Sequence, residues 1–160
     1  MASTSQDRTQ ALADYQSVLS LTGDSVRGRE VFRSRCSTCH QIGGIGVNVA
    51  PDISDSREKK PEQILTDILD PNRAIDNNYV GYSVLLADGQ VLSGIITAEA
   101  PTSLTIKQAE GKTATILRSE IEELRSTGKS LMPEGLEKGV TREQMADLIS
   151  FIKNWRYLRD

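Results

Sequence analysis

Apolar residues recur three or four positions apart in four stretches of the chain, a spacing typical of amphipathic helices. The expected helices cover about residues 10–20, 26–35 and 61–69, and a last one runs from Thr141 to nearly the end. The polar residues 1–9 show no such spacing and predict a disordered lead. Helices are thus expected toward both ends of the chain, and the residues between them follow a different pattern.

Residues typical of helix ends support three of these boundaries. Asp24 or Ser25 can cap the second helix, because a short polar side chain there accepts a hydrogen bond from a free backbone N–H. Pro61 fits the first turn of the third helix, where no partner for its missing N–H is needed. Thr141 and Gln144 match a capping box at the start of the last helix. Apolar spacing and helix ends therefore agree at three separate places.

Between about residues 79 and 124 the pattern changes to alternation, which is typical of β-strands. Asp88-Gly89 offers a tight turn between two such strands, and Glu110-Gly111 lies between two more. The expected strands cover about residues 80–86, 91–97, 103–108 and 113–117. We therefore predict a three- or four-stranded antiparallel meander, and an α+β fold in which it interrupts a helical core. A free edge of that sheet would allow a homodimer to form through it.

Composition and charge exclude two classes of partner. The chain has 160 residues, of which 38% are hydrophobic and 26% charged, and its formal net charge is −3. This length suits a single domain, expected over residues 10–160 with the meander as an insert at about 79–124. A stretch rich in Lys and Arg is missing from the sequence, which argues against nucleic acid as a partner. The apolar runs are too short to predict a transmembrane segment.

Cys36-Ser37-Thr38-Cys39-His40 carries the clearest chemistry, because Cys-x-x-Cys-His is the attachment signature of c-type haem. Two thiols at this spacing can each add across one vinyl group of the same porphyrin. The histidine that follows is then held against the ring, where its imidazole can bind the iron. The chain has two cysteines and one histidine in total. The sequence therefore predicts one covalent haem c held by Cys36, Cys39 and His40.

Three other interpretations of this motif are weaker. A thioredoxin-like redox pair is expected near a βαβ pattern, whereas here the motif follows the helix predicted over residues 26–35. A structural zinc site needs four ligands, and the cysteines and the histidine supply three. The remaining alternative is a chance pairing of two cysteines beside an ordinary histidine.

The second axial position of the iron also needs a ligand. The sequence has no second histidine, but it has three methionines, Met1, Met132 and Met145. Met1 is the start residue, and Met145 lies within the last predicted helix, where a packing role suits it better. Met132 precedes Pro133 on a predicted loop, which leaves its thioether free to reach the iron. Lys129 is the weaker alternative, because its amine would have to lose a proton near neutral pH.

In their order and spacing these residues resemble the class I cytochromes c. In that family a glycine and an aromatic residue precede the first haem cysteine by eight and four positions, as Gly28 and Phe32 do here. The resemblance implies that the helix carrying them crosses the last helix near Leu148 and Phe151. It also implies that the carbonyl of Pro51 accepts a hydrogen bond from the haem histidine and so orients its ring.

The meander is a large departure from a small cytochrome. With it, the chain resembles the haem-binding domain of Pirellula/Verrucomicrobium type, known from planctomycetes and verrucomicrobia, over about residues 24–157. The segments that carry the resemblance are Gly28–Phe32, Cys36–His40, Ile68–Asn72, Asp88–Gly94 and Leu131–Leu136. In that family the domain usually ends a longer chain with dehydrogenase-like propeller or helical-repeat regions. The resemblance therefore implies an electron-transfer module excised from such a chain.

The expected location is periplasmic, because haem c is attached outside the bacterial cytoplasm. The N-terminus lacks the charged and then apolar layout of a secretory signal. An excised domain would explain this difference.

The expected function is that of an electron carrier and not of an enzyme. Cys36 and Cys39 anchor the haem, His40 and Met132 ligate its iron, and Pro51 orients His40. The expected partners are redox proteins, namely a dehydrogenase-like donor or parent chain and a terminal acceptor. One alternative is a haem-based sensor or peroxidase-like enzyme, in which the distal site is open or labile. Another is an interaction module in which the meander docks a partner and the haem is structural.

Overall fold

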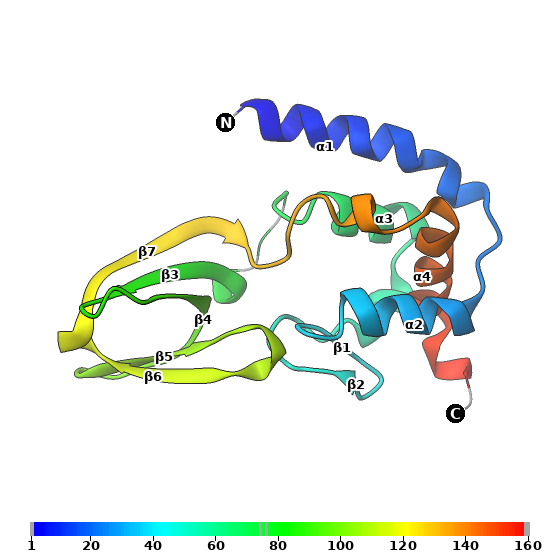
Figure 1. Cartoon of the computed structure of the whole chain (residues 1–160). Coiled ribbons are helices and arrows are strands. Elements are labelled where there is room, and N and C mark those ends of the chain that lie inside the picture. Colours follow the sequence, from blue (N-terminus) through cyan, green and yellow to red (C-terminus); the bar gives the residue numbers. More distant parts are fainter. Residues whose placement is uncertain (1, 74, 76, 159–160) are drawn as a thin grey trace.

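The computed structural model describes residues 2–73, 75 and 77–158 and consists of a helical part beside an antiparallel sheet (Figure 1). The predicted α+β fold is confirmed. The α-helices of the described chain are α1 (Ala2–Tyr15), α2 (Ser25–Arg35), α3 (Pro61–Leu69) and α4 (Arg142–Asn154). A short 3-10 helix, Gln16–Ser20, follows α1, so the first predicted helix continues in this tighter form.

The predicted helix starts are present in the structure. The Asp24 side chain accepts a hydrogen bond from the backbone N–H of Arg27 at 3.0 Å, which caps α2. Pro61 is the first residue of α3. Thr141 and Gln144 form a complete capping box, in which each side chain bonds the backbone N–H of the other residue.

Helices α2 and α4 cross at close range. Phe32 of α2 and Phe151 of α4 are buried at this crossing, with ring centroids 5.6 Å apart. A Cβ atom at Gly28 would overlap the backbone carbonyl of Asp147, so a glycine is required where the two backbones meet. The crossing unites the two ends of the sequence in one helical core, to which α3 adds its apolar face.

Within the predicted disordered lead over residues 1–9, the described residues are helical, because α1 begins at Ala2. The helix lies along α3 and is fixed there by Arg8, which is 6% exposed (Figure 1). The Arg8 guanidinium donates to the carboxylate of Glu137 at 2.9 Å and to the carbonyl of Leu69 at 3.0 Å. A polar side chain thus provides the anchor, which an analysis of apolar spacing does not detect.

The sheet has five strands, one or two more than the predicted meander. They are β3 (Val80–Leu86), β4 (Val91–Glu99), β5 (Ser103–Lys107), β6 (Thr113–Leu117) and β7 (Ile121–Ser130), in the order β6-β5-β4-β3-β7. The first four follow one another as predicted. Strand β7 returns to pair with β3, and it extends the sheet beyond the predicted limit at residue 124. Most of its residues are exposed, so alternation does not reveal it.

The sheet has a hydrophobic core of its own. Its buried members are Val84, Leu104, Ile106 and Ile116, which form a cluster separate from that of the helices. In the described part of the chain, the helices are all too short or too polar to span a membrane.

Candidate functional site

The Cys-x-x-Cys-His motif forms a tight turn at the end of α2. The backbone N–H groups of Cys39 and His40 both donate to the carbonyl of Cys36, at 3.2 and 2.9 Å. Both thiols are free and half-buried. A two-residue hairpin, β1 (Gln41–Ile42) and β2 (Ile45–Gly46), follows directly and supports the turn. The turn thereby presents both thiols and the imidazole on one wall of a cavity.

The surroundings of Cys36 do not suit a redox-active thiol pair. Burial, together with a smaller effect of the neighbouring Cys39, raises the pKa of Cys36 to about 12. A thioredoxin-like thiol needs a lowered pKa to act as a nucleophile. The described residues also contain no group of three or more His, Cys, Asp or Glu side chains placed to hold a metal ion, so a zinc site has no support.

The ring of His40 is oriented by a backbone carbonyl. Its Nδ1–H donates to the carbonyl oxygen of Pro51 at 2.7 Å. With the proton on Nδ1, the lone pair of the neutral ring lies on Nε2. Burial lowers the pKa of His40, while the bond to Pro51 acts in the opposite direction. The imidazole is therefore neutral at pH 7, and it is held in the tautomer that can bind a metal through Nε2.

One cavity, here called the central cavity, is lined by all five predicted site residues, Cys36, Cys39, His40, Pro51 and Met132. Its volume is about 860 Å³. This lies within the range of cofactor sites, about 300–1,000 Å³. Apolar side chains from α3 and α4 complete much of its wall, namely Ile64, Ile68, Leu148 and Ile152. A large and mainly apolar ligand therefore fits between the helices.

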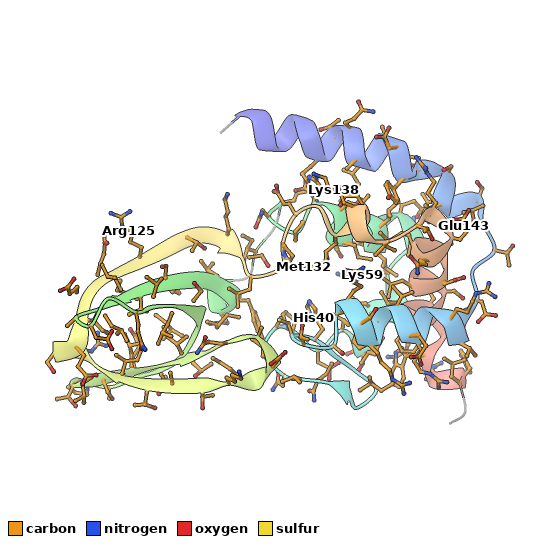
Figure 2. All side chains as sticks on the ribbon, in the orientation of Figure 1. His40, Lys59, Arg125, Met132, Lys138 and Glu143 are labelled. Carbon is orange, nitrogen blue, oxygen red and sulfur yellow. The ribbon has the colours of Figure 1, made fainter. Side chains whose placement is uncertain are left out.

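Met132 and His40 both line the central cavity. Figure 2 shows the two side chains on opposite sides of it. Met132 belongs to the Met132 loop, defined here as residues 131–135, which joins β7 to a 3-10 helix at Leu136–Gly139. Its side chain is half-buried against the helical core. Met145, in contrast, is fully buried within that core, and Lys129 is exposed on β7. Met1 lies outside the described residues.

Charged residues at the central cavity were not predicted. The Lys59 ammonium lies 2.8 Å from the carboxylate of Asp67, and the Arg73 guanidinium lies 3.5 Å from the same group. All three line the cavity, and Figure 2 shows Lys59 next to it. Isolated charged residues on different segments give no pattern in a sequence. Only the fold shows that they converge on one wall.

The sheet also reaches the central cavity, through Ile95 and Ala109. The turn between β5 and β6 contacts the Cys-x-x-Cys-His motif, where the backbone N–H of Glu110 donates to the carbonyl of Thr38 at 2.8 Å. Glu110 has φ +66°, a left-handed conformation that is uncommon for a residue with a side chain. The sheet thus closes one side of the site, a role that the sequence did not indicate.

A family model described as Cytochrome c matches residues 25–100. Over these residues the chain is similar to cytochrome c. The matched range contains α2, the Cys-x-x-Cys-His motif and α3, and it ends before the Met132 loop. No curated protein matches the chain. A cytochrome c domain binds covalently attached haem c, typically one per domain.

The residues present fit a haem c. Covalent attachment through a Cys-x-x-Cys-His motif needs two free thiols next to a histidine, and the tight turn at residues 36–40 provides both. Iron needs an unprotonated imidazole nitrogen, which the bond between Nδ1 and Pro51 leaves at Nε2. The apolar wall from α3 and α4 suits the faces of a porphyrin. The motif, the ring orientation and the cavity therefore agree on the same group.

Proposed function

We propose that this protein is an electron-transfer c-type cytochrome with one haem c, ligated by His40 and Met132. One observation carries the proposal. Both cysteines of the chain, its one histidine and Met132 line the same cavity, although Met132 is far from the others in sequence. This set contains every group that a six-coordinate haem c requires.

Each residue has a separate task in this proposal. The Cys36 and Cys39 thiols each add across a vinyl group, so that a C–S bond forms and the thiol hydrogen goes to the neighbouring vinyl carbon. His40 would bind the iron through Nε2, and Pro51 fixes the ring by accepting the Nδ1–H bond. Met132 would supply its thioether as the second protein ligand.

The bound haem supplies a one-electron Fe(III)/Fe(II) couple. His40 and Met132 together would fill both axial positions, which leaves none for a substrate or a gas. Thioether ligation by Met132 raises the reduction potential relative to a second imidazole. With both positions filled, a change of iron charge would need little ligand rearrangement, which favours rapid electron transfer over chemistry at the iron.

The proposed partners are redox proteins, with a dehydrogenase-like donor or parent chain and a terminal acceptor. This part of the proposal rests on the resemblance to the Pirellula/Verrucomicrobium-type domain, as does an extracytoplasmic, periplasmic location. The edge strands β6 and β7 offer a route to a homodimer by strand pairing. Size-exclusion chromatography coupled to light scattering would distinguish monomer from dimer.

The optical spectrum of the haem-loaded protein tests the ligand assignment. We expect the ferric form to show the weak long-wavelength band of methionine ligation, and the ferrous form to bind carbon monoxide poorly. Met132→Ala should lose the band and bind carbon monoxide readily, whereas Met145→Leu, a conservative change in the core, should keep the behaviour of the unaltered protein. An unaltered protein that lacks the band and binds carbon monoxide readily would support the sensor or peroxidase-like alternative instead.

A further inference from the structure

The side chain of Asn72, which lies outside the Met132 loop, forms hydrogen bonds on both sides of Met132. The carboxamide oxygen Oδ1 of Asn72 accepts a hydrogen bond from the backbone N–H of Ser130 at 2.8 Å. The carboxamide nitrogen Nδ2 of the same residue donates to the carboxylate of Glu134 at 3.0 Å. Ser130 and Glu134 each lie two positions from Met132. A single amide thus bonds the chain on both sides of the methionine.

Asn72 itself is held by a rigid element. It follows α3 directly, in a turn where the backbone N–H of Arg73 donates to the carbonyl of Asp70 at 3.2 Å. Pro71, which lies between them, has a fixed φ and lines the central cavity. The apolar face of α3 is buried in the helical core. The position of Asn72 is therefore set by the core and not by the loop it binds.

The rest of the loop has little regular structure to fix Met132. The backbone N–H of Met132 donates to the side-chain hydroxyl of Ser130 at 3.1 Å, so this bond also depends on where Ser130 lies. Further along, Tyr15 bonds the carbonyl of Glu137 and Arg8 bonds its carboxylate. These contacts hold the 3-10 helix that follows the loop, and the pairing of Ser130 with Val80 holds the end of β7 before it. Between these two supports, Asn72 bonds the chain on both sides of Met132.

We propose that Asn72 is a positioning residue that keeps the Met132 thioether at the iron. The inference rests on the proposed function, because it has meaning only if Met132 is the axial ligand. A neutral thioether on a loop stays bound only when the loop is ordered in the bound geometry. Because Asn72 directly follows α3, its two hydrogen bonds hold the loop in a fixed position relative to that helix. These bonds also give a structural role to Asn72 at the end of the Ile68–Asn72 segment.

The test compares variants of the haem-loaded protein that remove one bond or both. Asn72→Ala removes both hydrogen bonds of the amide. Glu134→Ala removes only the bond from Asn72 Nδ2 to the carboxylate. Glu134→Gln keeps an oxygen that can accept from the Asn72 amide, so it serves as the conservative variant. Asn154→Ala is the matched control, because its amide bonds the carbonyl of Ser150 on the exposed end of α4.

Carbon monoxide competes with Met132, so its apparent affinity reports the fraction of molecules in which the thioether has left the iron. Loss of both bonds should raise that affinity by about fivefold or more. Asn72→Ala should also weaken the long-wavelength ferric band and lower the reduction potential. Glu134→Ala should give a smaller change of the same sign. Glu134→Gln and Asn154→Ala should match the unaltered protein.

The Met132→Ala background separates positioning from general loss of structure. If Asn72 acts through Met132, adding Asn72→Ala to Met132→Ala changes neither carbon monoxide affinity nor reduction potential. An equal change in both backgrounds, or no change from Asn72→Ala while Met132→Ala opens the site, would overturn the proposal for Asn72. If Met132→Ala leaves the band and carbon monoxide binding unaltered, the ligand assignment itself is wrong. If Asn72→Ala does not fold, Glu134→Ala carries the same comparison.

Discussion

At the level of single residues, the positions where α2 and α4 cross tolerate few substitutions. Phe32 is fully buried and contacts the ring of Phe151. Gly28, one turn before Phe32 on α2, touches the backbone of α4. These positions join the two ends of the chain, and the Cys-x-x-Cys-His motif begins directly after α2. A defect at the crossing would therefore affect both the core and the base of the haem site.

Replacing Phe32 by alanine should lower the free energy of unfolding by about 3–5 kcal/mol, because a large ring leaves a packed core and a cavity remains. Denaturant unfolding of the haem-loaded protein would measure this loss. Tyr157→Ala is a suitable control, since that ring is 68% exposed and its removal should change stability by less than about 0.5 kcal/mol. A similar, small effect of both substitutions would show that Phe32 contributes little to the crossing.

Site residues with distinctive chemistry could be predicted from the sequence. Site residues whose role depends on a contact made in the fold could not. Two cysteines and a histidine in a known spacing point to haem before any fold is known. Asn72 and Lys59 belong to ordinary residue types. Their partners, Glu134 and Asp67, approach only after the chain has folded, so neither contact leaves a signal in the sequence.

At the level of elements, α1 is held to the rest of the molecule by a buried ion pair. Arg8 and Glu137 lie 2.9 Å apart, with side chains 8% and 7% exposed. The pair is only partly satisfied, because Arg8 Nε and Glu137 Oε2 are buried without a hydrogen-bond partner in the described structure. Such a pair contributes specificity of docking more than net stability.

Arg8→Met should therefore lower the free energy of unfolding by about 3–5 kcal/mol, because it leaves the Glu137 carboxylate buried without its partner. The double variant Arg8→Met with Glu137→Leu should recover most of that loss, since no unpaired charge remains. Thermal and denaturant unfolding of the two variants would measure the difference. Equal destabilisation in the single and double variants would indicate that the bond from Arg8 to the Leu69 carbonyl matters more.

Two elements differ from the sequence prediction for the same physical reason. Helix α1 is anchored by a charged residue, and β7 pairs through its backbone while most of its side chains face water. The first half of α1 and the whole of β7 therefore lack the apolar periodicity by which α3, α4 and strands β3 to β6 could be predicted. Backbone pairing and buried charge become visible only in the folded chain.

At the level of the whole molecule, the helical part and the sheet both border one central cavity. The helical core supplies Ile64, Ile68, Leu148 and Ile152 to its wall, and the sheet with its β5–β6 turn supplies Ile95 and Ala109. A haem c in this cavity would replace water with apolar contacts, mainly along α3 and α4. The stability of the helical part should therefore depend on the haem, and that of the sheet should not.

Cys36→Ala combined with Cys39→Ala, which prevents covalent attachment, tests this dependence. In the haem-free variant we expect amide hydrogens of α3 and α4 to exchange about tenfold or more faster than in the loaded protein. Amide hydrogens in the centre of β3 and β5 should change by less than about twofold, because the core residues of these strands, Val84, Leu104 and Ile106, do not line the central cavity. A uniform increase in exchange would indicate instead that the two cores unfold as one unit.

The pairing of Val80 with Ser130 has a consequence for how the chain folds. His40 and Met132 are separated by about 90 residues, and closing so long a loop carries an entropic cost that grows with its length. Once the sheet has formed, however, its first and last residues are neighbours, so the chain between the two proposed ligands is effectively about half as long. A sheet that folds early would thus bring Met132 toward His40 and lower the entropic cost of closing the site.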